Sequence, residues 1–232
     1  MPLWTCEQCG AQFPESGTPP ASCPICEDER QYVNWNGQTW LTREQLAAKH
    51  RLVWRDDLGL AGIGLEPAFA IAQRALLVPG QDGCVMWDCI PLATPDAIAH
   101  VKSLGGLKAI AVAHPHYYGA VVDWSEAFGG IPIYLHGDDR QWVTRPHPAI
   151  VPWTGDSKKI SDEITLIRTD GHFAGGTVLH WRGRPRRVVD RRRRHGGGGP
   201  ALAQFHVQLS ELHSSFEGQC PAHCQNAGAI AD

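Results

Sequence analysis

The chain has 232 residues, of which 43% are hydrophobic, and its formal net charge is −3. This apolar fraction is enough for a folded core and excludes wholesale disorder, while the length fits one domain with a small appendage. No apolar run predicts a membrane span and the first residues show no signal-peptide pattern, so we expect a cytoplasmic protein without membrane contact.

Residues 1–40 form a unit that is defined by two cysteine pairs. Cys6 and Cys9 are one pair, Cys23 and Cys26 the other, and 13 residues separate them. In a chain without a secretion signal, cysteines are first interpreted as metal ligands or free thiols. Two Cys-x2-Cys turns supply four thiolates that close a tetrahedron, so this spacing predicts a metal site. Four unrelated free thiols are the weaker interpretation.

The same segment resembles zinc ribbons and the rubredoxin-like modules of rubrerythrins. Such modules bind zinc or iron, and thiolate softness does not choose between these metals. We favour structural zinc, with an iron centre that transfers one electron as the alternative. A unit of this size has almost no core of its own, so the metal is expected to keep it folded.

Strands alternate with helices after this unit, which predicts an α/β layered fold. Thr42 and Thr94 are expected helix N-caps, and Pro95 fits the first helical position. The predicted elements are helices at 42–50, 94–104 and 120–128, strand-like sequence at 58–78, a hairpin at 75–88, and strands at 107–113, 131–135, 164–168 and 177–181.

His114 and His116 follow the buried strand at 107–113. In extended backbone, residues i and i+2 point to the same side, so both imidazoles are expected at the carboxyl edge of a sheet. His172 lies in a glycine-rich turn between two predicted strands and is a plausible third ligand. Three neutral imidazoles suit zinc or iron. A His-x-His pair alone is more often structural than a metal site. The additional His172 favours the metal site.

Together these pieces resemble the metallo-β-lactamase superfamily, whose hallmark is His-x-His-x-Asp-His after a strand and a later Gly-His turn. The matching segments read His114-x-His116-x-Tyr118-Gly119 and Gly171-His172-x-x-Gly175-Gly176. The resemblance covers residues 58–181. It implies an α/β fold, a metallo-β-lactamase-like αββα sandwich in residues 55–181 that is incomplete at its C-terminal side. It also implies a metal-dependent hydrolase acting on a small-molecule substrate of the ester or thioester type.

Two positions depart from the superfamily pattern. Tyr118 stands where the superfamily has aspartate, and Gly119 where it has histidine. A phenol with a reference pKa near 10 does not replace a carboxylate as ligand or base at neutral pH, and glycine has no side chain. We therefore expect no second metal and assign no catalytic base. One zinc on His114, His116 and His172 leaves a single-metal hydrolase, or an inactive binding protein with a structural zinc, as the hypotheses.

Residues 182–232 differ in character from the rest of the chain. Residues 182–199 carry eight arginines and one aspartate, and residues 200–232 carry no lysine or arginine. This composition favours an irregular, disordered tail that is out of frame relative to its ancestor, with a weak helix at 203–216 and no strand beside 177–181. The alternative is nucleic-acid binding by the arginines. We do not expect it, because the run stands where an α/β sandwich needs its next buried strand, and no tryptophan is interleaved with the arginines as a stacking platform.

Overall fold

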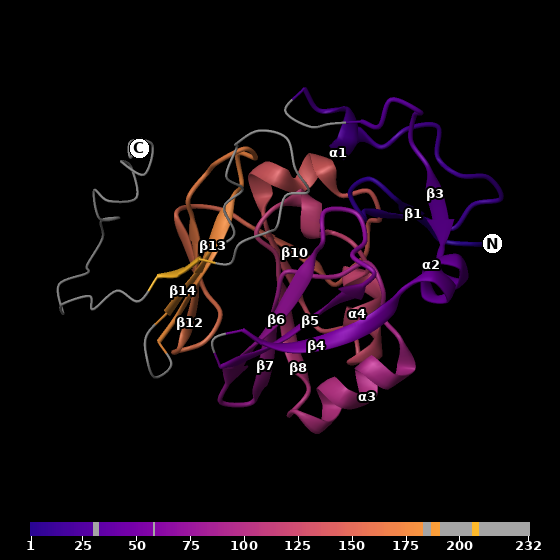
Figure 1. Ribbon diagram of the computed structural model, residues 1–232. Helices are drawn as coiled ribbons and strands as arrows, with labels where there is room; N and C mark the ends of the chain where they lie inside the picture. Colours follow the sequence, from indigo (N-terminus) through magenta and orange to yellow (C-terminus); the bar gives the residue numbers. More distant parts are fainter. Residues whose placement is uncertain (30–32, 58, 183–186, 191–205, 209–232) are drawn as a thin grey trace, which may run out of the picture.

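The structure is a computed structural model that describes residues 1–29, 33–57, 59–182, 187–190 and 206–208 (Figure 1). Its strands form three sheets. A small antiparallel sheet near the N-terminus has the order β2-β1-β3, with β1 at Trp4–Cys6, β2 at Gln12–Phe13 and β3 at Trp40–Thr42.

The largest sheet has seven strands in the order β10-β9-β8-β7-β6-β5-β4. They are β4 (Arg51–Asp57), β5 (Leu60–Glu66), β6 (Arg74–Gly80), β7 (Gly83–Trp87), β8 (Leu107–Ala111), β9 (Ile133–His136) and β10 (Ile150–Trp153). The pairings from β4 to β7 are antiparallel, and those from β7 to β10 are parallel.

The third sheet is antiparallel and has the order β11-β12-β13-β14-β15. Its strands are β11 (Ser157–Lys159), β12 (Ile164–Arg168), β13 (Thr177–Trp181), β14 (Arg187–Asp190) and β15 (His206–Gln208). The helices are α1 (Pro24–Glu27), α2 (Arg43–Lys49), α3 (Pro95–Ser103) and α4 (Val121–Ala127), with 3-10 turns η1 (Pro115–Tyr117) and η2 (Gly137–Trp142).

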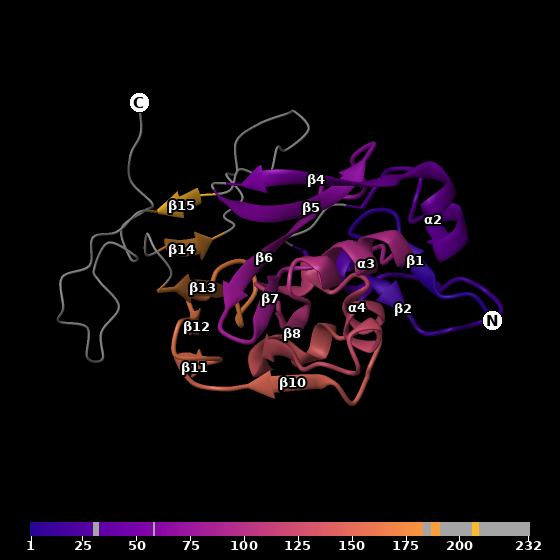
Figure 2. The same cartoon turned by 90° about the horizontal axis from the view of Figure 1, so that it is seen from below.

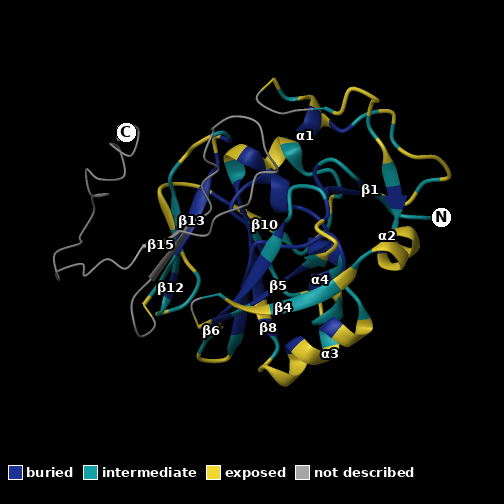
Figure 3. Ribbon diagram, in the orientation of Figure 1, coloured by how far each residue is buried: buried dark blue, intermediate teal, exposed yellow. Residues whose placement is uncertain are grey.

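The two larger sheets pack face to face and share one hydrophobic core. Leu166 and Leu179 of the five-stranded sheet are fully buried in the same cluster as Leu76 and Met86 of the seven-stranded sheet. Helices α3 and α4 cover the other face of the seven-stranded sheet (Figure 2). Buried residues are concentrated along β6 to β8, between these layers (Figure 3). The predicted α/β layers, two sheets that pack face to face with helices outside, are confirmed for the seven-stranded side of this arrangement.

Local signals account for most elements between residues 42 and 181. The Thr42 hydroxyl accepts from the Gln45 amide, and the Gln45 side chain accepts from the Thr42 amide, which completes a capping box. The Thr94 hydroxyl caps α3. The predicted hairpin is confirmed as β6–β7, and the strands at 164–168 and 177–181 are confirmed as β12 and β13.

The expectation for the beginning of the tail is wrong. β13 has a neighbour, because β14 pairs with it from Leu179↔Val189 to Trp181↔Arg187, and β15 pairs with β14. Residues 206–208 are extended, which also contradicts a helix over 203–216. Residues 183–186, 191–205 and 209–232 lie outside the described part, and the out-of-frame origin of the tail stays a prediction. No helix in the described ranges has the length and apolar character of a membrane span.

Candidate metal centres

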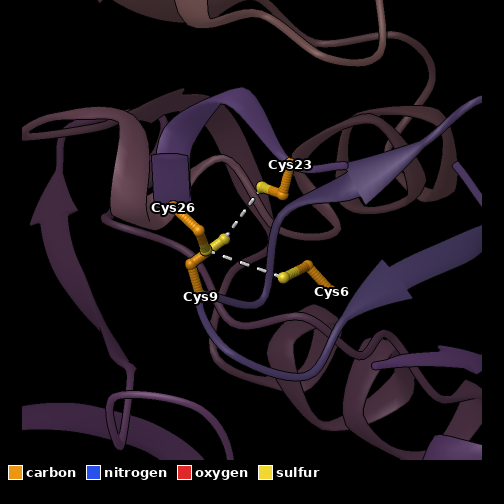
Figure 4. Close-up of side chains that lie close together, drawn as sticks. All are labelled: Cys6, Cys9, Cys23 and Cys26. Atoms are coloured by element: carbon orange, nitrogen blue, oxygen red, sulfur yellow. Dashed lines mark hydrogen bonds between the residues drawn. The ribbon is translucent and has the colours of Figure 1, made fainter. Parts of the chain in front are cut away.

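The four cysteines come together around the small N-terminal sheet (Figure 4). Cys6 ends β1, Cys9 lies in the turn to β2, Cys23 is the N-cap of α1, and Cys26 lies in α1. The turn is held by bonds from the Cys6 amide to the Ala11 carbonyl (2.9 Å) and from the Gly10 amide to the Cys6 carbonyl (2.8 Å).

The spacing of the four sulfurs fits a tetrahedral metal. The Sγ atoms of Cys6 and Cys26 are 3.7 Å apart, those of Cys9 and Cys23 are 3.6 Å apart, and all four lie within 4.8 Å of one another. Four sulfurs bonded at about 2.3 Å to one zinc would be about 3.8 Å apart. The predicted cluster is therefore confirmed in its geometry, and its occupation by a metal remains a proposal.

The thiols strongly perturb one another. Hydrogen bonds from the neighbouring thiols, that of Cys23 foremost, lower the pKa of Cys6 far below its usual range. The pKa values of Cys9 and Cys26 are raised, first by their hydrogen bonds with Cys23. A cluster that shares its protons in this way holds one thiolate readily and further ones only with a compensating cation.

The three predicted histidines also converge. His114 is the N-cap of η1, His116 lies within η1, and His172 lies in the loop between β12 and β13. The Nε2 atom of His172 is 3.3 Å from the Nδ1 atom of His116, and one ring nitrogen of each histidine lies within 4.8 Å of the other two. Two nitrogens bonded at about 2.1 Å to one tetrahedral zinc would be about 3.4 Å apart. The donor set and its spacing therefore fit one ion.

The expectation that extended backbone makes His114 and His116 point to the same side is wrong. His114 itself is extended, with φ −171° and ψ 173°, but the chain then enters the 3-10 turn η1. The two rings are 5.1 Å apart at an interplanar angle of 89°, so they meet edge to face and do not project side by side. A turn that begins at Pro115 brings them together, because proline favours the first position of a helical turn.

Hydrogen bonds from both sheets fix the loop that carries His114. Asp88 has left-handed φ of 62°, and its carboxylate accepts from the Ala113 amide at 2.8 Å, one residue before His114. The Ala113 carbonyl accepts from the Thr177 amide at 2.9 Å, which ties β13 to the same loop. The strained backbone at Asp88 is thus compensated by a bond that positions a histidine.

Asp139 is a contributor that the sequence did not identify. It lies in η2, is 1% exposed, and accepts from the Gly175 amide at 2.8 Å. A Cβ atom on Gly175 would lie 2.7 Å from the Asp139 carboxyl carbon, so glycine is required for this approach. Asp139 therefore anchors the turn that carries His172, and no local pattern indicates this long-range contact.

The two departures from the superfamily pattern are built into the packing. Burial, and secondarily the charge of Asp139, raise the pKa of the Tyr118 phenol well above its ordinary value. The Tyr118 hydroxyl donates to the Asp139 carbonyl at 3.4 Å. A Cβ atom on Gly119 would lie 3.0 Å from the Pro91 Cα, so no side chain fits there without a backbone shift. Neither position offers a ligand for a second metal.

No protein-family model matches the sequence. Several solved structures match part of this chain. The subclass B3 metallo-β-lactamase MEM-A1 from a soil metagenome library is 17% identical, with a TM-score of 0.42 over 53% of this chain and 54% of that one. The DIM-1 metallo-β-lactamase is 13% identical, with a TM-score of 0.46 over 58% and 66%. An N-acyl homoserine lactone hydrolase is 17% identical, with a TM-score of 0.37 over 47% and 57%. The matched part is thus less than two thirds of each of these structures.

One curated protein is much more similar in sequence. The uncharacterized protein YmaE of Bacillus subtilis (strain 168) is 45% identical over 184 residues, which cover 78% of this chain and 67% of YmaE. This level of identity over this share of both chains shows common descent, and the chain belongs to the same protein family as YmaE.

Proposed function

We propose that this protein is a metal-dependent hydrolase-like protein that holds one zinc on His114, His116 and His172 and a structural zinc on the four cysteines. The observation that carries the proposal is the convergence of three histidines, with 3.3 Å between ring nitrogens of His172 and His116. The histidines lie on two separate loops. Hydrogen bonds from the Ala113 amide to the Asp88 carboxylate and from the Thr177 amide to the Ala113 carbonyl hold the loop of His114 in place. Iron is the alternative metal at either site.

A zinc ion with three histidine ligands and an open position would supply a Lewis acid and a bound water with a pKa near 7. The chain supports this chemistry by holding the imidazoles in place. His114 and His116 are 8% and 2% exposed, and Phe173 packs against all three rings. The resulting low-polarity wall limits water on that side of the histidines.

We propose that the substrate is a small-molecule ester or thioester, the class that the resemblance to the metallo-β-lactamase superfamily implies. Tyr118 does not act as a base at neutral pH, because its raised pKa keeps it protonated. Gly119 offers no group at all. We therefore propose a reaction that needs one metal and no carboxylate at position 118, which favours substrates with a good leaving group.

The experiment is hydrolysis of a panel of ester and thioester substrates by the full chain, with and without a chelator. His172→Ala tests the site, and His100→Ala is the matched control, because His100 is exposed on α3 beside Trp54. We expect hydrolysis that chelation and His172→Ala abolish and His100→Ala leaves intact. Activity that survives both treatments would contradict the proposal.

The second candidate function is a binding protein without catalysis. The buried Tyr118 and the steric block at Gly119 favour it, because they remove the positions that serve a second metal in the superfamily. It predicts one zinc per chain, which Cys6→Ser removes and His116→Ala does not affect. Nucleic-acid binding would instead require RNA affinity that falls steeply with salt and disappears when residues 182–199 are deleted.

A further inference from the structure

One buried side chain lies between the two candidate metal centres. Gln73 directly precedes β6 and is 4% exposed. Its Nε2 atom donates to the Cys9 carbonyl and also to the His116 carbonyl, the latter at 2.7 Å. Both partners are carbonyl oxygens, so the amide NH₂ group uses its two hydrogens, one toward each centre. Gln73 therefore joins the backbone of a cysteine ligand to that of a histidine ligand.

Gly10 makes this bridge possible. It has a left-handed φ of 78°, and a Cβ atom there would lie 2.6 Å from the Gln73 Nε2 atom. Glycine satisfies both demands, because it adopts positive φ without strain and leaves the space open. The turn of the first cysteine pair is thus shaped to admit a side chain from the main core.

Phe173 provides a second connection, which is apolar. It follows His172 directly, is 1% exposed, and is buried in one cluster with the four cysteines. Its ring centroid is 4.8 Å from that of His172, 5.2 Å from that of His116 and 5.7 Å from that of His114. One face of the histidine cluster therefore packs on a ring that also belongs to the core of the cysteine unit.

A separate polar network fixes the cysteine unit to the core through β2. The Gln12 side chain donates to Asp123 at 3.2 Å and accepts from Arg145. The main-chain carbonyl of Gln12 accepts from the Thr144 hydroxyl at 2.8 Å. Arg145 also donates to Asp123 at 2.6 Å. These bonds attach the unit without involving any histidine of the site, so attachment and positioning use different residues.

We propose that the four-cysteine unit positions the histidine site. A metal on the cysteines fixes the Cys9 turn, Gln73 and Phe173 pass this restraint to His116 and His172, and the affinity of the histidine site for metal rises. Gln73 and Phe173 are positioning residues in this scheme, since they act through the ligands. The inference rests on the proposed function, because it requires that the histidines bind a metal. The coupling is reciprocal, so an occupied histidine site also strengthens metal binding by the cysteines.

The test is titration of the metal-free full chain with Co²⁺ followed by absorption spectroscopy. Cobalt on four thiolates gives intense sulfur-to-metal charge-transfer absorption, whereas cobalt on imidazoles gives only weaker d–d bands. The two sites are therefore measured separately in one sample. The variant is Gln73→Met, which keeps length and removes both donors. Gln12→Met is the matched control, because Gln12 is another buried glutamine at the same interface.

We expect Gln73→Met to lower cobalt affinity at the histidine site about tenfold, as does loss of a bond that orients a ligand. We expect Gln12→Met to change it by less than about twofold. Equal affinities in the two variants would overturn the proposal. Absence of the histidine-site bands in the unmodified chain would overturn the proposed function itself, a distinct result. If Gln73→Met does not fold, Phe173→Leu carries the same test, and an unchanged affinity there overturns the proposal.

Discussion

The cysteine cluster and the histidine cluster are neighbours, but they are built in opposite ways. The cysteines come from a stretch that begins at Cys6 and ends at Cys26, and its regular structure beyond β1 is the two-residue strand β2 and the four-residue helix α1, which contains Cys26. The histidines come from loops 58 residues apart, His114 beside the seven-stranded sheet and His172 beside the five-stranded one.

This difference indicates what holds each site. The cysteine unit has few buried side chains besides the cysteines, notably Ile25, Ala11 and Phe13, so we expect its stability to depend on a bound metal. The histidine loops are fixed by Asp88, Thr177 and Asp139, which belong to the main core. Loss of a cysteine should therefore unfold structure, whereas loss of a histidine should mainly remove a metal.

The largest effect is expected for Cys26→Ser. It removes one of four thiolates from a buried cluster, so the cysteine unit loses its metal and with it the main source of its stability. We expect the free energy of unfolding in denaturant to fall by about 3 kcal/mol or more. Cys84→Ser is the control, because Cys84 is a buried free thiol on β7, and it should cost about 1 kcal/mol. Equal losses of unfolding free energy in Cys26→Ser and Cys84→Ser would show that the cysteine unit does not depend on a bound metal for its stability.

An intermediate effect is expected for Gly119→His, which restores the histidine of the superfamily motif. The new Cβ atom would meet Pro91 at 3.0 Å, and we expect a stability loss of about 1–3 kcal/mol without any additional bound metal. Gly17→His is the control, since a Cβ atom on Gly17 meets nothing within 4 Å. A gain of one metal per chain in Gly119→His would show that the packing does not exclude a second site.

The smallest effect concerns Tyr118 and appears only at alkaline pH. Burial raises its pKa in the folded chain, whereas the unfolded chain ionises near the reference pKa of about 10. The contribution of Tyr118 to stability is therefore constant below pH 10 and is lost as the pH rises further. Tyr118→Phe should cost less than about 1 kcal/mol at neutral pH, because its hydrogen bond is long, and should reduce the alkaline loss. Denaturant unfolding between about pH 8 and pH 11 measures this, and an undiminished alkaline loss in Tyr118→Phe would contradict it.

The sequence predicted what local rules determine. The two cysteine turns, the Thr42 and Thr94 caps and the β6–β7 hairpin all depend on residues close together in the chain. The edge strand β4 was missed, because its sequence is largely charged and its pattern is recognisable only beside β5. The convergence of His114, His116 and His172 was predicted, but the reason given for His114 and His116 was wrong, because η1 interrupts the extended backbone between them.

The supporting residues of the site could not be predicted. Gln73, Asp139 and Phe173 contact Cys9, Gly175 and His116, each of which is 36 or more residues away in the chain, and no spacing rule applies to such contacts. The arginine-rich composition also led to a wrong prediction at the beginning of the tail, where β14 pairs with β13. Arg187 ends the pairing of β14 with β13, although an arginine-rich segment argues against a strand. Backbone pairing to an existing edge does not require an apolar pattern when the ladder supplies the hydrogen bonds.

The most direct test of the central claim is the metal content of the purified chain and of two variants, His116→Ala and Cys6→Ser. We expect two metal ions per unmodified chain. His116→Ala should keep one metal ion, the one at the cysteine site. When the variant is loaded with cobalt, this ion should show thiolate charge-transfer absorption. Cys6→Ser should lose the metal of the cysteine site and weaken the other. One metal per chain, lost in Cys6→Ser and unchanged in His116→Ala, would contradict a metal centre at the histidines and leave a binding protein with a single structural zinc.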